Sequence, residues 1–89
     1  MEKEILIIGI KGCPGCERVK KAIDDGELDA RYLDAEEDED AQDIINKLQP
    51  YYAPFVVVKE NNEYKECKLK HKDGKFKIDC DDAGPLEIE

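Results

Sequence analysis

Two stretches of the chain are almost wholly apolar, residues 4–10 and residues 55–58. A short continuous run of this kind is typical of a strand that is buried on both faces of its sheet. Both stretches are therefore predicted to be central strands. A third, shorter strand is predicted at residues 30–33.

Two other segments carry apolar side chains at the spacing of an amphipathic helix. The first is predicted to be helical over about residues 14–25, because Pro14 suits the first helical position and Gly26 suits a C-terminal stop. The second has apolar positions at 41, 44, 45 and 48 and ends before Pro50. Acidic side chains crowd before it and into its first turns, where the helix dipole favours them: Asp34, Glu36, Glu37, Asp38, Glu39, Asp40 and Asp43. We interpret this run as solvated surface, with a binding patch as the alternative.

The last third of the chain alternates between apolar and polar positions around Asp73-Gly74, a strong signal for a two-residue hairpin. Pairing across this turn gathers one set of side chains on one face: Cys67, Leu69, His71, Phe76, Ile78 and Cys80. The other face carries lysines at 68, 70, 72, 75 and 77, which we interpret as protection of a sheet edge against aggregation. A slip of one residue would exchange the two faces, so the alternation specifies the register. The expected order is β-α-β-α-β-β-β, a mixed α/β arrangement in one domain over residues 1–89.

Composition limits the partners of the protein. Among 89 residues there are 23 acidic and 14 basic side chains, and the formal net charge is −9. This charge argues against binding to nucleic acid or to an anionic membrane, and its self-repulsion favours a monomer. No apolar run is long enough to cross a bilayer, and the first run lacks the cleavage site of a signal peptide. We therefore expect a cytoplasmic protein, in a compartment where thiols stay reduced.

The sequence Cys13-Pro14-Gly15-Cys16 joins the first predicted strand to the first predicted helix. Unpaired amides and the helix dipole at such a position favour the thiolate of Cys13 over its thiol. Cys16 lies within the first turn and is expected to attack a mixed disulfide formed on Cys13. Lys11 either adds positive potential near Cys13 or is a solvated loop lysine. This arrangement predicts a thiol–disulfide exchange site.

The strand before the cysteines, the Cys-Pro-Gly-Cys motif, the strand–helix crossover and the proline that opens strand 55–58 together resemble the thioredoxin superfamily, and its small glutaredoxin-like members in particular. The resemblance covers roughly residues 4–70. It implies a thioredoxin-like fold, a mixed sheet with helices on its faces, and here an extra C-terminal hairpin in place of the last helix. It also implies a thiol–disulfide oxidoreductase that reduces disulfides of proteins or small molecules and is itself reduced by a thiol reductant or a reductase.

The same resemblance implies the site residues. In this family the proline that opens the strand follows a cis peptide bond and faces the cysteines, so Ala53-Pro54 would be that bond, with its backbone next to a bound substrate. Lys11 and Pro14 are expected to contact the substrate beside the cysteines. Glutaredoxins hold glutathione with a Gly-Gly turn and an acidic residue that this chain lacks. No cofactor beyond the dithiol is therefore implied.

A Cys-x-x-Cys pair also occurs in metal sites, so a second function stays open, a non-catalytic module that binds a metal or an iron–sulfur cluster. Cys67, His71 and Cys80 are the other candidate ligands. If strand 55–58 lies between the first strand and the hairpin, the two cysteine pairs are about 10 Å apart, too far for one tetrahedral zinc site. We therefore expect no zinc bound by all four cysteines.

Cys67 and Cys80 face each other in the predicted hairpin. They are either two small apolar residues on a buried face or a cross-strand disulfide, which would staple the sheet or form a second redox couple. The predicted position is a non-hydrogen-bonded pair with Cα atoms about 4.5 Å apart, within disulfide reach. His71, near the hairpin tip, is expected at the same end of the sheet as Cys13, where it either contacts a substrate or packs against Phe76.

Overall fold

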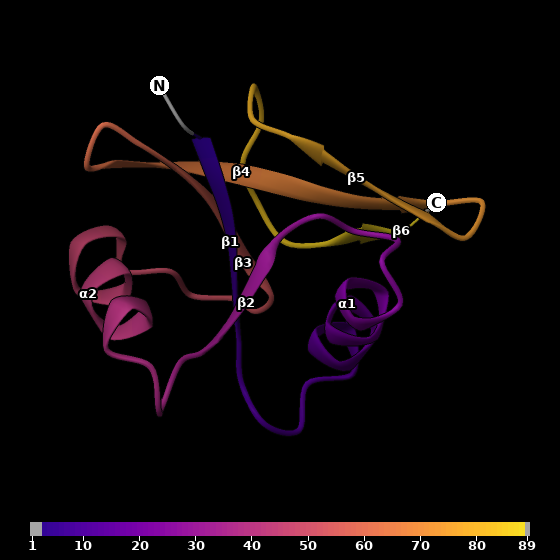
Figure 1. Cartoon of the computed structure of the whole chain (residues 1–89), viewed down its shortest axis with the longest axis horizontal. Coiled ribbons are helices and arrows are strands. Elements are labelled where there is room, and N and C mark those ends of the chain that lie inside the picture. Colours follow the sequence, from indigo (N-terminus) through magenta and orange to yellow (C-terminus); the bar gives the residue numbers. More distant parts are fainter. Residues whose placement is uncertain (1–2, 89) are drawn as a thin grey trace.

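Six strands in one mixed sheet and two helices make up residues 3–88, which are the residues that the computed structural model describes (Figure 1). The elements are β1 (Lys3–Gly9), α1 (Pro14–Asp24), β2 (Arg31–Asp34), α2 (Glu39–Leu48), β3 (Phe55–Glu60), β4 (Glu63–Lys72), β5 (Lys75–Asp79) and β6 (Glu87–Ile88). The strand order is β2-β1-β3-β4-β5, and β6 pairs with β4. β1 pairs with β2 and β4 with β6 in parallel, whereas the other pairs are antiparallel.

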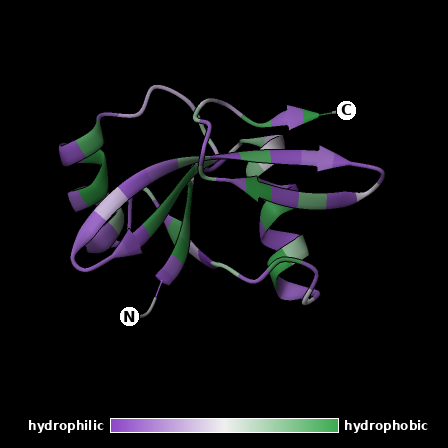
Figure 2. Ribbon diagram, turned by 90° about the horizontal axis from the view of Figure 1, so that it is seen from above, coloured by the Kyte–Doolittle hydropathy of each residue, from purple (hydrophilic) through white to green (hydrophobic). Residues whose placement is uncertain are grey.

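The alternation of side chains along the central strands builds an apolar core on each face of the sheet. One core joins β1, β2 and β3 to α2 and contains Leu6, Ile8, Leu33, Ala41, Ile44, Phe55 and Val57. The other core joins β1, β3 and β4 to α1 and its following loop and contains Ile7, Val19, Ala22, Leu28, Val56, Cys67 and Leu69. Figure 2 shows the apolar strand segments in green in the middle of the molecule. The predicted burial of both central strands on two faces is confirmed.

The predicted elements are all present, with small shifts of their ends. The hairpin register is confirmed, since Lys72 pairs with Lys75 and Leu69 with Ile78 across Asp73-Gly74. One assignment was wrong. Ile10 was expected inside the first strand, but β1 ends at Gly9 and the Ile10 side chain is 45% exposed.

The C-terminal segment packs on the α1 side of the sheet, in place of the final helix that the sequence lacks. Leu86 packs against the α1-side core, and β6 pairs with Lys70 and His71 of β4. The Lys68 ammonium lies 3.0 Å from Glu87 and 3.8 Å from Asp82, and the hydrogen bond to Glu87 is the main reason that its pKa is raised. β6 was not predicted, because a strand of two residues leaves no periodic signal.

The β4–β5 hairpin points away from the cysteine motif, contrary to the expectation. Its tip lies next to Glu27, which follows the far end of α1. Figure 1 shows β4 crossing β1 steeply, so that its second half extends past α1. The twist that accumulates from strand to strand rotates β4 relative to β1, so the hairpin tip does not lie at the end of the sheet that holds Cys13. His71 stacks on Phe76, with ring centroids 4.3 Å apart.

Within residues 3–88, neither helix has the length and apolar character needed to cross a bilayer.

Candidate functional site

Cys13 is the N-cap of α1, and its own sulfur caps the helix. The backbone of Cys13 is extended, at φ −102° and ψ 110°, after Gly12, which adopts φ +77°. Its Sγ accepts a hydrogen bond from the Cys16 backbone N–H at 3.2 Å, and its carbonyl accepts from the Glu17 N–H at 3.1 Å. The sulfur therefore lies where the free amides of the first helical turn converge, which stabilises a negative charge on it.

The two cysteines differ in accessibility. Cys13 is half-buried, whereas Cys16 lies on the inward face of α1 and is 0% exposed. Their sulfurs are within bonding distance, and their Cα atoms are 5.2 Å apart. A partner molecule can therefore reach Cys13, while only the neighbouring sulfur can reach Cys16.

The start of β3 lies against this pair. The Ala53-Pro54 peptide bond is cis, as the family resemblance implied. The Ala53 carbonyl oxygen is 3.7 Å from Cys13 Sγ, and Pro54 is buried. A Cβ atom added at Gly15 would come within 3.3 Å of both Pro54 and Leu86. Gly15 is thus packed between Pro54 and the C-terminal segment, and a side chain at this position would require these neighbours to shift by a few tenths of an ångström.

The other predicted contact residues lie on the outer side of the motif. Pro14 is exposed at the first helical position. Lys11 is also exposed, and its Nζ lies 3.6 Å from a carboxylate oxygen of Glu37. This ion pair offsets part of the positive potential that the sequence suggested for Lys11.

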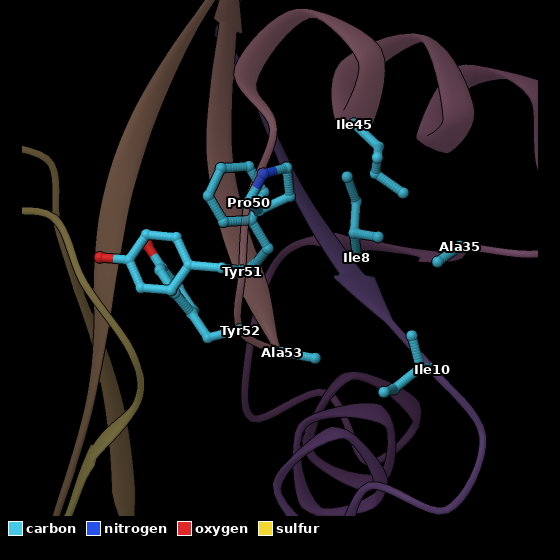
Figure 3. A pocket seen from close by; sticks show the side chains of 9 residues that line it. Ile8, Ile10, Ala35, Ile45, Pro50, Tyr51, Tyr52 and Ala53 are labelled. Atoms are coloured by element: carbon cyan, nitrogen blue, oxygen red, sulfur yellow. The ribbon is translucent and has the colours of Figure 1, made fainter.

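An apolar groove adjoins the site, and sequence reasoning missed it. It encloses about 250 Å³ and is lined by Ile8, Ile10, Ala35, Ile45, Pro50, Tyr51, Tyr52, Ala53 and Phe55. Figure 3 shows these side chains arriving from β1, from the loops after β1 and β2, from α2 and from the segment that leads into β3. In the structure Ile10 and Tyr51 are 45% and 92% exposed. The sequence carried no signal for the groove, because Ile10 was predicted to lie in a buried strand and the residues that line the groove are distant in the sequence.

Tyr52 connects the groove to the C-terminal half of the chain. Its ring meets Phe55 edge-on with centroids 5.5 Å apart, and its hydroxyl donates a hydrogen bond to Glu66 of β4. Burial, and then the bond to Glu66, raise the pKa of the Tyr52 phenol well above its usual value. The phenol therefore stays protonated and holds the loop before β3 to β4.

The second cysteine pair lies on the α1 side of the sheet. The sulfurs of Cys67 and Cys80 are within bonding distance, and their Cα atoms are 4.1 Å apart. Cys67 is buried beside Leu69 in the α1-side core, whereas Cys80 is half-buried. Because β3 lies between β1 and β4, this pair is separate from the Cys13–Cys16 pair. In the described part of the chain, no three His, Cys, Asp or Glu side chains are grouped to hold a metal ion.

The chain was also compared with known proteins. No protein family, no curated protein and no solved structure matches it.

Proposed function

We propose that this protein is a thiol–disulfide oxidoreductase, a small glutaredoxin-like member of the thioredoxin superfamily, that reduces disulfides of proteins or small molecules through Cys13 and Cys16. One observation carries the proposal. At the start of α1 the Cys13 Sγ accepts a hydrogen bond from the Cys16 backbone N–H, with 3.2 Å between sulfur and nitrogen, and the Cys16 Sγ lies within bonding distance of it. Cysteines at helix N-termini have pKa values of about 3.5–7.5, against 8.5 for a free cysteine.

The reaction has two displacement steps, and its atoms and electrons balance. The Cys13 thiolate attacks one sulfur of the substrate disulfide, a Cys13–substrate disulfide forms, and the other substrate sulfur leaves as a thiolate and takes up a proton. Cys16 then loses its proton and attacks Cys13 Sγ. The second substrate thiol leaves, and the protein holds the Cys13–Cys16 disulfide. Two electrons have passed from the dithiol to the substrate.

The surroundings of the sulfurs assign these roles. Cys13 is the nucleophile because it is accessible and accepts an amide hydrogen bond. Cys16 is the resolving cysteine, since its burial shields its sulfur from external disulfides. Ala53 and Pro54 form the wall on which a substrate backbone would lie, and Lys11 and Pro14 border its outer side.

A dithiol reductant or a thioredoxin-type reductase would return the oxidised protein to the dithiol. Glutathione is not favoured, because the chain after β4 continues into β5 and lacks the Gly-Gly-acid segment that holds it in glutaredoxins. The proposal places the protein in the cytoplasm as a monomer, where reduction of disulfides is the default direction.

Disulfide reduction by a dithiol reductant tests the proposal with three proteins, the wild type, Cys13→Ser and Cys16→Ser. We expect Cys13→Ser to abolish turnover. Cys16→Ser is expected to accumulate a covalent adduct that intact mass spectrometry detects and a reductant reverses. The doubly substituted protein Cys67→Ser, Cys80→Ser is the matched control and should retain turnover.

Full activity in Cys13→Ser would overturn the proposal. So would loss of activity only in the control protein, because the second cysteine pair would then carry the reaction. Parallel assays with glutathione and with a thioredoxin-type reductase identify the electron donor.

The alternative, a metal or iron–sulfur module, predicts different properties. A cluster held by Cys13 and Cys16 would need further ligands, such as the same cysteines of a second copy. The visible absorbance and the metal content of protein purified without oxygen show directly whether a cluster or a metal ion is bound. Stoichiometric iron or zinc that Cys13→Ser removes would favour the module over the enzyme.

A further inference from the structure

The apolar groove beside Cys13 is a surface without a partner inside the described chain. Ile10 and Tyr51 on its rim are 45% and 92% exposed, and Ile8 and Phe55 form its floor. Exposed large apolar side chains that gather around a concavity mark an interaction site rather than scattered surface residues.

The size of the groove fits one bulky side chain. It encloses about 250 Å³, and an apolar cavity of roughly 150 Å³ already accepts benzene. Drug-sized and cofactor ligands occupy about 300–1,000 Å³. Figure 3 shows Ile8, Ile45 and Ala35 converging on one space, with Pro50 on its other side and the Tyr51 ring directed outward. The walls are aliphatic and aromatic, so the fitting group is aliphatic or aromatic too.

The groove adjoins the reacting sulfur through Ala53. Ala53 belongs to its wall, and the Ala53 carbonyl oxygen is 3.7 Å from Cys13 Sγ. Ile10 lies three positions before Cys13. An extended peptide advances about 3.3–3.6 Å per residue. A side chain within about three residues of the attacked cysteine therefore reaches the groove.

The rim next to the groove is acidic and ordered. Ala35 lines the groove, and Glu36, Glu37, Glu39 and Asp40 follow it as exposed carboxylates. The Asp34 side chain accepts the N–H groups of Glu36 and Glu37 at 2.8 and 3.3 Å, which holds this loop in place. Lys11 is already paired with Glu37. The groove thus opens beside a negative field that favours a cationic partner.

Building on the proposed function, we propose that the preferred substrates are cationic polypeptides with a bulky apolar side chain within three residues of the disulfide and a lysine or arginine beside it. The apolar side chain enters the groove, and the cation faces the acidic segment at residues 36–40, which runs from the loop after β2 into the first turn of α2. These two contacts make binding of such substrates stronger than binding of other disulfides, before any sulfur reacts. It also disfavours glutathione, which carries two carboxylates and no large apolar group.

Four synthetic peptides test the inference, each a symmetric disulfide dimer. Within three residues of the cysteine, each peptide carries either phenylalanine or glycine, and the next residue is either lysine or glutamate, which gives the four combinations. Reduced Cys67→Ser, Cys80→Ser protein, in which Cys13 and Cys16 are the remaining cysteines, is mixed with each peptide. The reaction is stopped with acid, and the fraction with a Cys13–Cys16 disulfide is determined by mass. We expect a rate constant about tenfold higher for phenylalanine than for glycine, which corresponds to partial burial of one large side chain. Lysine should exceed glutamate by about tenfold at low salt and by less than threefold in 0.5 M sodium chloride, because salt screens the rim charges.

Variants locate each preference. Tyr51→Ser removes an exposed rim residue and should reduce the phenylalanine-to-glycine ratio to about threefold or less. Glu36→Gln with Glu37→Gln should reduce the lysine-to-glutamate ratio. The matched control is Asp24→Asn with Asp25→Asn, which removes the same number of negative charges. These residues lie at the C-terminal end of the 11-residue helix α1, about 16 Å from Pro14, so both rate ratios should stay unchanged.

The outcomes separate the two proposals. Equal rates with all four peptides, each abolished by Cys13→Ser, overturn the substrate inference and leave the oxidoreductase standing. Failure of every peptide to oxidise the protein overturns both. A dimer in sedimentation that Tyr51→Ser dissociates would show that a second copy covers the groove, which also overturns the inference.

Discussion

The disulfide between Cys67 and Cys80 is expected to stabilise the fold, and this can be measured by oxidising and reducing the pair without replacing either of its two cysteines. The protein is prepared as Cys13→Ser, Cys16→Ser, so that this pair alone responds to oxidants, and is compared in oxidised and reduced forms. The sequence separation is 13. Closing a loop of this length lowers the entropy of the unfolded chain enough to stabilise the fold by about 3 kcal/mol. Because small domains have about 5–15 kcal/mol in total, the effect is a large fraction of the stability.

Urea unfolding measures this difference. A slope of about 1–3 kcal/mol per molar urea converts 3 kcal/mol to a midpoint shift of about 1–3 M. The same protein carrying Cys67→Ala and Cys80→Ala should show no shift between oxidising and reducing buffers. Coincident unfolding curves of the oxidised and reduced forms, with mass spectrometry confirming the bond, would refute the reasoning.

Three further predictions concern the site and its supports. Leu86→Ala removes a half-buried side chain from the α1-side core and should cost about 1–2 kcal/mol in denaturant unfolding, less than a fully buried leucine. In that background Gly15→Ala should cost less than in the wild type, because one of its two close contacts is gone; equal costs would show that Leu86 does not restrict Gly15. The pKa of the Tyr52 phenol is raised on folding, so its bond to Glu66 contributes stability that is complete below pH ~10 and is lost as the pH rises further. The difference in unfolding free energy between the wild type and Tyr52→Phe should therefore shrink above that pH, and a difference that grows there would contradict the assignment. Finally, thiolate absorbance of reduced Cys16→Ser, Cys67→Ser, Cys80→Ser protein should give Cys13 a pKa at least one unit below ~8.5, whereas a value equal to that of a free peptide would remove the basis of its role.

Much of the fold was readable because its signals are local. The runs at 4–10 and 55–58 are apolar without interruption, and both cores of the sheet use them in alternation. The register at Asp73-Gly74 followed from one turn type and from the fact that side chains alternate between faces. The candidate dithiol was equally local, since a cap and its helix are neighbours in the chain.

The tertiary structure decided the features that join distant segments. The groove draws on four separate stretches of the chain, and its exposed member Ile10 was assigned to a buried strand. The direction of the hairpin depends on twist summed over several strands, which carries no residue-level signal. The close packing of Leu86 and Pro54 around Gly15 joins the C-terminal segment to the cysteine motif, and no pattern in the motif revealed it.

The amino-acid sequence alone determined which residues form strands and helices, and it placed Cys13 at a helix start, because hydrophobic period, turn residues and capping act over a few positions. Only the folded chain decided what surrounds that sulfur. The apolar groove, the acidic rim and the C-terminal cover on Gly15 are contacts between segments whose approach depends on strand order and twist.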